Sequence, residues 1–542
     1  MTVAPGQVLR SGLLLDGTGG APVVADVRLA GGVIDAVGQP DGSLVQPGDE
    51  VVDVTGAAVA PGFVDIHTHA DFSLPSHPGA SSMVRQGVTT LVVGNCGFSP
   101  FPVGPGARAE LLHQATTVFG RGLAWQWEDL PGYAAHLARI GTTVNVAALV
   151  GHAAVRIAVM GYDRRDATPD ELEQMRTLVA EAMAAGAYGI SSGLIYPPGS
   201  YAPASELVAL CEVVAAYGGL YATHMRNEGE QLLVAVEEAL EIARRSGVRL
   251  QLSHHKVLGR RNWGLTAQSL AIIDQAVADG VDLALDQYPY PASSTTMVAL
   301  VPAWAAEGGT AALAARLNDP DVRAAVRDEV LNGPTDGRPK RDFEPDTVMI
   351  SSVGRPEHQQ YVGQRLDEIA RSQGREPVDV MLDLLAADGG VEVVIFAIGD
   401  DDIQRVMRHP LVAVASDGWT MDPAEGGSPH PRSYGTFARV LQKYVREDAI
   451  LTLPEAVRRM TSLPADRLGM HDRGRITPGA AADVVVFDPS RVTEESTFLD
   501  PHRFASGVTG VWVAGERVVV DGEETGARPG TVLRHGVPAA AS

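Results

Sequence analysis

Cysteine is scarce in this chain, since only Cys96 and Cys211 occur among 542 residues. Two residues cannot form the several crosslinks of a disulfide-rich secreted domain, so that class of fold is excluded. Long apolar runs are missing as well: no window approaches the roughly 20 apolar residues of a membrane-spanning helix. The first residues also lack the apolar stretch behind basic residues that marks a signal peptide. We therefore expect a cytoplasmic protein with no membrane partner.

Positive charge is in deficit. The chain has 43 Lys and Arg against 66 Asp and Glu, which gives a formal net charge of −23 at pH 7. Such a surplus repels phosphate backbones and anionic surfaces at long range, so we expect no nucleic-acid partner. The acidic residues form no long run, which is typical of a solvated surface, and the composition leaves the oligomeric state open.

The middle of the chain, residues 62–470, alternates β-branched runs with amphipathic segments. This pattern indicates repeated βα units and predicts an α/β fold, a (β/α)₈ TIM-like barrel. Two apolar runs, 347–351 and 391–398, exceed a count of eight, so the assignment near the seventh strand stays open. The eight candidate strands are 63–67, 89–95, 143–151, 188–193, 220–224, 249–254, 281–288 and 411–417.

The two ends of the chain are rich in short β-segments. Neither 1–61 nor 471–542 is large enough for a core of its own, so we expect the two to combine into one small β-sandwich beside the barrel. Residues 291–345 are rich in Ala, Gly, Asp and Pro and interrupt the βα rhythm. They predict an inserted subdomain after the seventh strand.

Polar residues stand at the ends of several candidate strands. In a barrel the carboxyl ends of all strands share one face, where active sites lie, so these side chains should converge. A single histidine there is more often a surface residue, but five coincidences favour a metal site built from imidazole and thiolate ligands. His69 lies two positions after His67 and points the same way. The strand-end residues are His67, Cys96, His224, His254 and Asp417.

The second cysteine has a different setting. Cys211 lies in SELVALCEVVAAYGG, a helical pattern in which a small apolar thiol packs inward. We therefore expect it to be a packing residue and not a ligand. His152 and His430 also lie near strand ends or in late loops, which leaves a supporting role open for them.

An ordered set of motifs resembles the amidohydrolase superfamily, and its details resemble the D-aminoacylase (N-acyl-D-amino-acid deacylase) family. The similarity runs from about residue 8 to 530. A His-x-His pair alone would be weak evidence, whereas the ordered set is specific. The motifs are PGFVDIHTHAD (61–71), GNCGFSP (94–100), SSGLIYPPGSYA (191–202), THMRNEGE (223–230), LSHHKVLGR (252–260), DQYPYPASST (286–295), SDG (416–418) and HPRSYGTF (430–437).

The resemblance implies a zinc cofactor. It assigns one tightly bound zinc to Cys96, His224 and His254, and a second, weaker position to His67 and His69 whose occupancy stays open. His255 competes with His254, but neighbours on a strand face opposite sides, and the spacing from residue 224 resembles the family's for His254.

Lysine provides a further constraint. Many dinuclear amidohydrolases bridge their metals with a carboxylated lysine on the fourth strand, but no lysine precedes Lys256 in this chain. That bridge is therefore impossible here. A thiolate binds Zn²⁺ at about 2.3 Å and can be shared between ions, so Cys96 is the sensible replacement.

The expected reaction is hydrolysis of the amide bond of N-acyl-D-amino acids, with Asp417 as general base and then general acid. Arg432 suits the substrate's α-carboxylate as a planar, bidentate partner, and Lys256 would assist. Preference for the D enantiomer is implied by resemblance only. The absence of a second basic cluster near Arg432 favours neutral over acidic side chains. Tyr196, Tyr288 and Ser294 resemble residues that line the family's substrate pocket.

Two other functions compete with this reading. A cyclic-amide hydrolase of hydantoinase or dihydroorotase type would share the fold, the metals and the aspartate, but its usual lysine bridge is missing. A non-catalytic interaction protein with an amidohydrolase fold would be expected to lose ligands or the aspartate, and none is missing.

Overall fold

Eight parallel strands form the central sheet of the computed structural model, which describes residues 5–104, 108, 111, 125–334 and 343–536. Each strand overlaps one of the eight candidate runs, so the expected barrel strands are confirmed. Their order in the sheet is β16-β12-β11-β10-β9-β8-β7-β6. The strands are β6 (Phe63–Asp65), β7 (Val88–Val93), β8 (Asn145–Gly151), β9 (Gly189–Gly193), β10 (Leu220–His224), β11 (Arg249–Leu252), β12 (Leu283–Gln287) and β16 (Val412–Val414).

Backbone contacts just past the strand ends close the barrel between β6 and β16. The amide of Asp417 donates to the carbonyl of His67 at 2.8 Å, and the amide of His69 donates to the carbonyl of Gly418 at 2.8 Å. A parallel bridge joins Thr68 to Gly418 between these two bonds. The first and last strands are thus tied together at the face where we expect the site.

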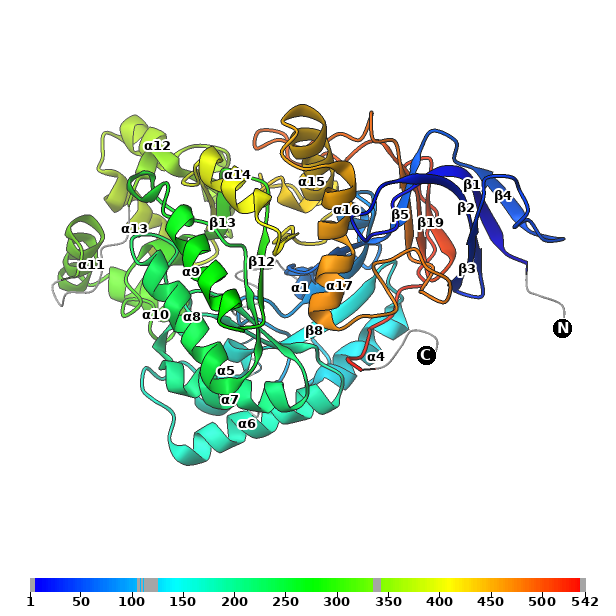
Figure 1. Cartoon of the computed structure of the whole chain (residues 1–542). Coiled ribbons are helices and arrows are strands. Elements are labelled where there is room, and N and C mark those ends of the chain that lie inside the picture. The colour runs from blue at the N-terminus through cyan, green and yellow to red at the C-terminus, as the bar shows by residue number, and fades with distance from the viewer. Residues whose placement is uncertain (1–4, 105–107, 109–110, 112–124, 335–342, 537–542) are drawn as a thin grey trace.

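Helices cover the outside of the barrel and connect its strands (Figure 1). Helix α6 (Pro169–Ala184) begins with a capping box, in which Thr168 and Glu171 each bond the other's backbone amide and Pro169 takes the first helical position. The principal helices are α4 (Leu130–Ile140), α5 (His152–Met160), α6 (Pro169–Ala184), α7 (Ala204–Ala216), α8 (Leu232–Ser246), α9 (Thr266–Ala278), α14 (Asp400–Arg408), α15 (Arg432–Arg439), α16 (Leu453–Met460) and α17 (Ser462–Leu468).

The two surplus apolar runs belong to a separate sheet. β15 (Glu392–Ile395) pairs antiparallel with both β13 (Ser293–Thr296) and β14 (Val348–Ser352), so neither run is a barrel strand. This sheet and its helices have a hydrophobic core of their own. The expected insertion ended at residue 345, but the sheet continues to Ile395. Its helices are α10 (Gly309–Leu317), α11 (Pro320–Asn332), α12 (Leu366–Gln373) and α13 (Pro377–Ala387).

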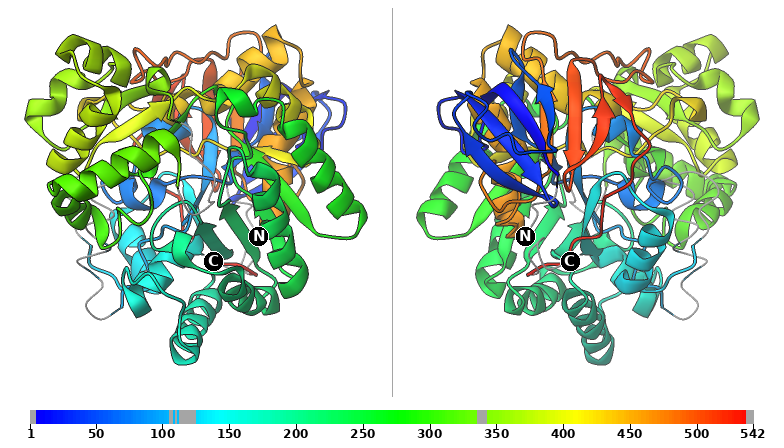
Figure 2. Two further views of the ribbon diagram at one scale, coloured as in Figure 1. Left: turned by 90° about the vertical axis from the view of Figure 1, so that its left-hand side faces the viewer. Right: turned by 90° about the vertical axis from the view of Figure 1, so that its right-hand side faces the viewer.

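The terminal segments form one nine-stranded sheet, in which β5 pairs with β17 and joins the two ends of the chain (Figure 2). Side chains from both ends, among them Leu9, Val27 and Trp512, share one hydrophobic core. The two ends of the chain therefore combine into one β-structure beside the barrel, as expected. Its strands are β1 (Gln7–Leu14), β2 (Val23–Ala30), β3 (Val33–Gly38), β4 (Glu50–Asp53), β5 (Ala58–Pro61), β17 (Val484–Phe487), β18 (Val508–Val513), β19 (Glu516–Val520) and β20 (Glu523–Glu524).

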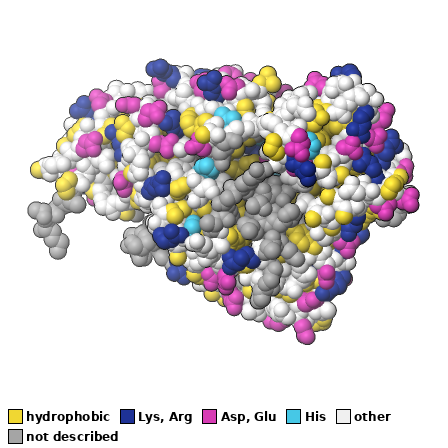
Figure 3. Space-filling model, turned by 180° about the vertical axis from the view of Figure 1, so that it is seen from behind, with side chains coloured by type: hydrophobic (Ala, Val, Ile, Leu, Met, Phe, Trp, Pro, Cys, Tyr) yellow, Lys and Arg dark blue, Asp and Glu magenta, His cyan; other side chains and the backbone are white. Residues whose placement is uncertain are grey.

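The surface carries mixed charge. On the face shown in Figure 3, acidic and basic side chains are interspersed, so the acidic surplus is not gathered into one patch there. Within the described ranges, no helix combines the length and apolar character that crossing a bilayer requires.

Candidate metal centre and active site

Cys96 lies at the centre of the converging strand ends. Its Sγ atom is 3.3 Å from Nε2 of His67, 3.5 Å from Nε2 of His254 and 3.7 Å from Nδ1 of His224. All four side chains are buried. Residues that are far apart in sequence thus meet at one thiol, as the positions at strand ends predicted.

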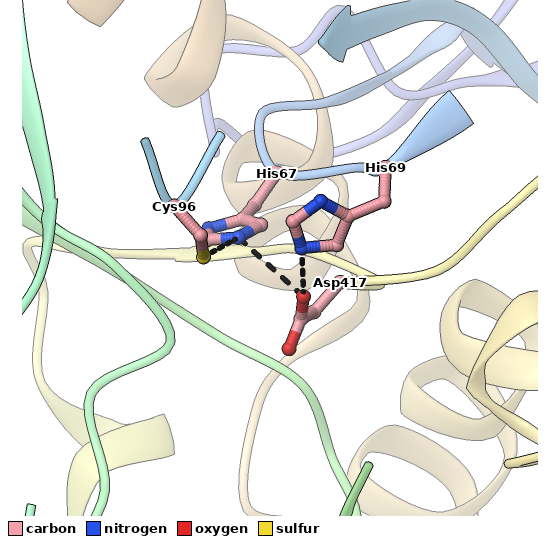
Figure 4. Close-up of side chains that lie close together, drawn as sticks. All are labelled: His67, His69, Cys96 and Asp417. Carbon is pink, nitrogen blue, oxygen red and sulfur yellow. Dashed lines mark hydrogen bonds and ion pairs between the residues drawn. The ribbon is translucent and has the colours of Figure 1, made fainter. Parts of the chain in front are cut away.

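Asp417 lies on the other side of His67. Its Oδ1 atom is 3.1 Å from Nε2 of His69 and 3.5 Å from Nε2 of His67, as Figure 4 shows. Potential ligand atoms therefore form two groups that share Cys96, and the atoms within each group lie within 4.8 Å of one another. The first group is His67, His69, Cys96 and Asp417, and the second is Cys96, His224 and His254.

The backbone at these strand exits adopts a conformation that side chains rarely take. Cys96, His254 and Asp417 have φ angles of 53°, 35° and 51°, in the left-handed region. Such strain persists only where the surroundings impose it, and it is concentrated at functional sites. A Cβ atom on Gly193 would lie 2.1 Å from the carbonyl oxygen of Cys96, so only glycine lets β9 approach this turn.

The cluster favours charged side chains despite its burial. Burial raises the pKa of the Cys96 thiol, but the charges of His67 and His254 outweigh it and hold this pKa well below its usual value. Burial raises the pKa of Asp417 too, and Arg432 and His69 bring it well below its usual range. For His69, burial lowers the pKa, while hydrogen bonding to Asp417 raises it to about 9. An anionic thiol and carboxylate are the forms that bind a divalent cation.

The donor set fits zinc. Thiolate sulfur and imidazole nitrogen are preferred zinc ligands, and a structural disulfide is ruled out because the other cysteine is remote. Nε2 of His224 is buried and makes no hydrogen bond among the described residues, although Glu228 lies 3.5 Å from it. A shared thiolate between two ligand groups is the arrangement expected where no lysine bridge exists.

His255 and Cys211, the alternatives to His254 and Cys96 as ligands, lie away from the cluster. Nε2 of His255 contacts Oγ of Ser269 on α9 at 2.9 Å, so the side chain faces away from Cys96, as expected for the neighbour of His254. Cys211 is fully buried inside α7, and burial raises the pKa of its thiol. Neither residue belongs to the two ligand groups.

Two carboxylates that were not predicted from the sequence hold the histidines. Oδ1 of Asp286, at the end of β12, accepts the backbone amide of His254 at 2.7 Å and lies 3.2 Å from Nδ1 of His67. Glu228 lies 3.1 Å from Nδ1 of His254 and 3.5 Å from Nε2 of His224. Carboxylates of this kind fix the orientation of ligating imidazoles. Their only sequence signals were a strand-end position and a His-x₃-Glu spacing.

Arg432 and Lys256 both lie near the Tyr288 ring. Nη1 of Arg432 donates to Oδ2 of Asp417 at 2.7 Å, and its guanidinium carbon lies 5.1 Å from the ring centroid. Nζ of Lys256 donates to Oε1 of Glu228 at 2.6 Å and lies 5.6 Å from the centroid. The Tyr288 hydroxyl is buried without a hydrogen-bond partner among the described residues, and burial raises its pKa well above the usual value. It is a neutral donor beside two cations.

The remaining predicted pocket residues line the same cavity, which has a volume of about 290 Å³. The Tyr196 ring packs 5.2 Å from the His224 ring, and its hydroxyl lies 3.1 Å from Oγ1 of Thr295. The Ser294 carbonyl lies 3.5 Å from Nη2 of Arg432. His430 supports Arg432, because its Nδ1 accepts the Arg432 backbone amide at 3.0 Å. The cavity therefore joins the potential metal ligands around Cys96 to a cationic wall, which we define as Arg432 and Lys256.

The chain is similar to known proteins over most of its length. The model of the amidohydrolase family matches residues 50–519. The chain is 37% identical over 538 residues to an N-acyl-D-aspartate deacylase of Alcaligenes xylosoxydans xylosoxydans, covering 98% of this chain and 96% of that protein. It is 36% identical to a D-aminoacylase of the same organism, covering 97% of each.

A solved structure is similar over almost the whole chain. It is the N-acyl-D-glutamate deacylase of Bordetella bronchiseptica in complex with zinc and a phosphonate inhibitor that mimics the tetrahedral intermediate. The TM-score is 0.80 at 36% sequence identity, and the match covers 97% of this chain and 99% of that one.

Proposed function

The chain belongs to the amidohydrolase family, and we propose that it hydrolyses the amide bond of N-acyl-D-amino acids with the help of zinc. The products are a carboxylate and a free D-amino acid. The observation that carries this proposal is the thiol of Cys96, which two groups of histidines share beside Asp417. The names of the relatives, which are deacylases of N-acyl-D-amino acids, support the substrate class.

We assign the tighter zinc to Cys96, His224 and His254. His67 and His69 would hold a second, weaker ion together with the shared sulfur. Bound zinc would supply Lewis-acid polarisation of the scissile carbonyl and would make the attacking water more acidic. The anionic state favoured for Cys96 supports this assignment.

Asp417 is the proton carrier of the proposed reaction. Its Oδ1 atom faces His67 and His69 at the cluster, and its low pKa keeps it ready to accept a proton from water. The water oxygen bonds to the amide carbon, and Asp417 then delivers the proton to the nitrogen as the C–N bond breaks. The nitrogen leaves as the free amine of the amino acid.

The cationic wall would hold the α-carboxylate of the substrate. Arg432, Lys256 and the hydroxyl of Tyr288 can all donate, and Tyr196 and Ser294 complete the lining. A carboxylate held there places the adjacent amide over the metal cluster, which converts binding energy into orientation. Arg432 would then contact both the substrate and Asp417.

A hydrolysis panel on purified, zinc-loaded protein tests the proposal. The substrates are N-acetyl-D-methionine, N-acetyl-L-methionine, N-acetyl-D-glutamate and hydantoin. We expect turnover of at least one N-acetyl-D-amino acid, well above the rate for the L-isomer. Turnover of hydantoin alone would assign the chain to cyclic amides, and a lack of turnover with all four would contradict the proposal.

A further inference from the structure

The charged side chains that line the cavity are nearly all paired. Arg226 binds Glu238, Lys256 binds Glu228 and Arg432 binds Asp417. Of the remaining acidic residues, Glu230 lies 3.0 Å from Arg261, and Glu344 lies 3.9 Å from Arg260. Glu392 also lines the cavity, yet its side chain forms no hydrogen bond or close ion pair with any residue that the structure describes.

The sheet of the inserted part positions Glu392. Arg432 approaches this sheet at the carbonyl of Ser294 on β13, and Thr296 follows two residues further along. Thr296 is directly opposite Glu392 on β15. Residues two apart on a strand share a face and are separated by about 6.6 Å, and directly opposed residues also share a face. Glu392 therefore lies on the strand beside β13, about two residues further along the sheet than the point where Arg432 contacts it.

This placement matches the geometry of an amino acid bound by its carboxylate. The α-carbon bears both the carboxylate and the side chain, so a substrate held at Arg432 extends its side chain from that point. The acyl chain extends in the opposite direction, from the amide carbonyl that would lie at the proposed metal site. A long side chain can thus run along β13 toward Glu392.

We propose that Glu392 recognises the substrate side chain, favouring N-acyl-D-amino acids with a cationic side chain such as lysine and disfavouring acidic ones. This inference rests on the proposed deacylase function and names its substrate class. A lysine ammonium on its flexible four-carbon stem would give Glu392 the counter-charge that the protein does not provide. An acidic side chain in the same place would instead oppose ionisation of Glu392.

The electrostatics of Glu392 also favour a cationic ligand. Burial raises the pKa of Glu392 to about 8, although Arg432 acts to lower it. An uncompensated carboxyl group in a cavity is a costly feature unless a ligand offsets it. A bound cation would stabilise the ionised form and so bind more tightly than a neutral side chain of similar length.

The test compares three substrates that differ in side-chain charge: N-acetyl-D-lysine, N-acetyl-D-methionine and N-acetyl-D-glutamate. In the zinc-loaded protein we expect kcat/KM to be highest for lysine and lowest for glutamate. Glu392→Gln should lower the lysine-to-methionine ratio by at least about 10-fold, mainly through KM. The matched control is Glu357→Gln, because Glu357 is exposed on the same inserted part and does not line the cavity.

Charge reversal makes the test independent of partial misfolding. Glu392→Arg should raise kcat/KM for N-acetyl-D-glutamate, a gain that a damaged fold cannot give. A lysine-to-methionine ratio that Glu392→Gln leaves unchanged would overturn the inference. So would a preference for glutamate in the wild type that disappears in Glu392→Gln, since Glu392 would then donate a hydrogen bond to an acidic side chain.

Binding separates this inference from the proposed function. Calorimetry with the three ligands and an Asp417→Asn protein, with and without Glu392→Gln, measures side-chain selection without turnover. A lysine preference that depends on Glu392 supports the inference even if no substrate is hydrolysed. Equal affinities for lysine and methionine overturn it, even if the N-acetyl-D-amino acids are good substrates.

Discussion

The two walls of the cavity differ in how their polar groups are satisfied. On the barrel wall, Cys96, Asp417 and the histidines contact one another, and carboxylates such as Asp286 and Glu228 hold them from behind. On the wall formed by the inserted sheet, Glu392 stands without a partner among the described residues. A network in which each member supports the next keeps reacting groups in place, whereas a carboxyl group without a hydrogen-bond partner is free to meet a ligand. We therefore assign the chemical step to the barrel wall and selection of the substrate side chain to the wall of the inserted sheet.

The largest expected effect would come from the centre of the barrel wall. Cys96→Ser should lower kcat/KM by about 10³-fold or more, because loss of the proposed shared zinc ligand would remove several kcal/mol of transition-state stabilisation. The zinc content measured by atomic emission should fall with the activity.

The second cysteine provides the matched control. Cys211→Ser places a hydroxyl in the buried interior of α7, so it should lower stability and leave zinc content and rate near those of the wild type. If Cys211→Ser lost its zinc while Cys96→Ser kept it, the assignment of the two cysteines would be reversed.

Asp417→Asn is expected to have the next largest effect. Asparagine preserves size but cannot carry the proton, so kcat should fall at least about 10²-fold. The zinc content should change much less than in Cys96→Ser, because the Cys96, His224 and His254 group stays complete. Near-normal kcat at saturating substrate would show that another residue moves the proton.

The fold was more predictable from sequence than the contacts within the site. The barrel strands repeat a simple pattern of apolar runs, and residues such as His224 and Asp417 stand at strand ends, so both the barrel and their convergence could be predicted. The pattern of β15 is equally apolar, and nothing local distinguishes an antiparallel strand in an insertion from a barrel strand. The assignment of this strand therefore could not be decided from the sequence, and the insertion was predicted to end at residue 345.

Side-chain contacts between distant elements could not be derived from periodicity. Asp286 and Glu228 are ordinary polar residues in sequence, and only the fold brings them to His67 and His254. The ion pair between Arg432 and Asp417 was likewise unforeseen. It changes the experiment on Arg432, because removal of the guanidinium affects the carboxylate as well as the substrate.

Arg432→Ala should have an intermediate effect with two separable parts. Loss of a charge-assisted contact to the α-carboxylate should lower kcat/KM by about 10-fold to 150-fold more for an N-acetyl-D-amino acid than for its amide. Loss of the neighbouring cation should also raise the pKa of Asp417, so the acid limb of the kcat profile should move to higher pH for both substrates.

Lysine at position 432 separates these two parts. Arg432→Lys keeps the charge near Asp417 but not the planar pair of donors, so it should restore the pH profile more fully than kcat/KM. Equal losses on the acid and the amide, without a shift of the profile, would mean that Arg432 only supports its loop. The α-carboxylate would then have to be bound by Lys256.

The smallest expected effect concerns the other wall and is a change in stability. Burial raises the pKa of Glu392 from 4.5 to about 8, so the folded protein holds this proton over a pH range in which the unfolded chain has lost it. Glu392 therefore costs no stability below about pH 4.5. The free energy of unfolding then declines as pH rises, and the whole cost of ionising this buried group is present above about pH 8. Glu392→Gln removes the ionisable group, and its melting temperature relative to the wild type should rise between pH 5 and pH 9. The matched variant Glu357→Gln, at an exposed site, should show no such trend. A constant difference between Glu392→Gln and the wild type across this range would show that the carboxylate already has a counter-charge, and the contrast between the two walls would no longer hold.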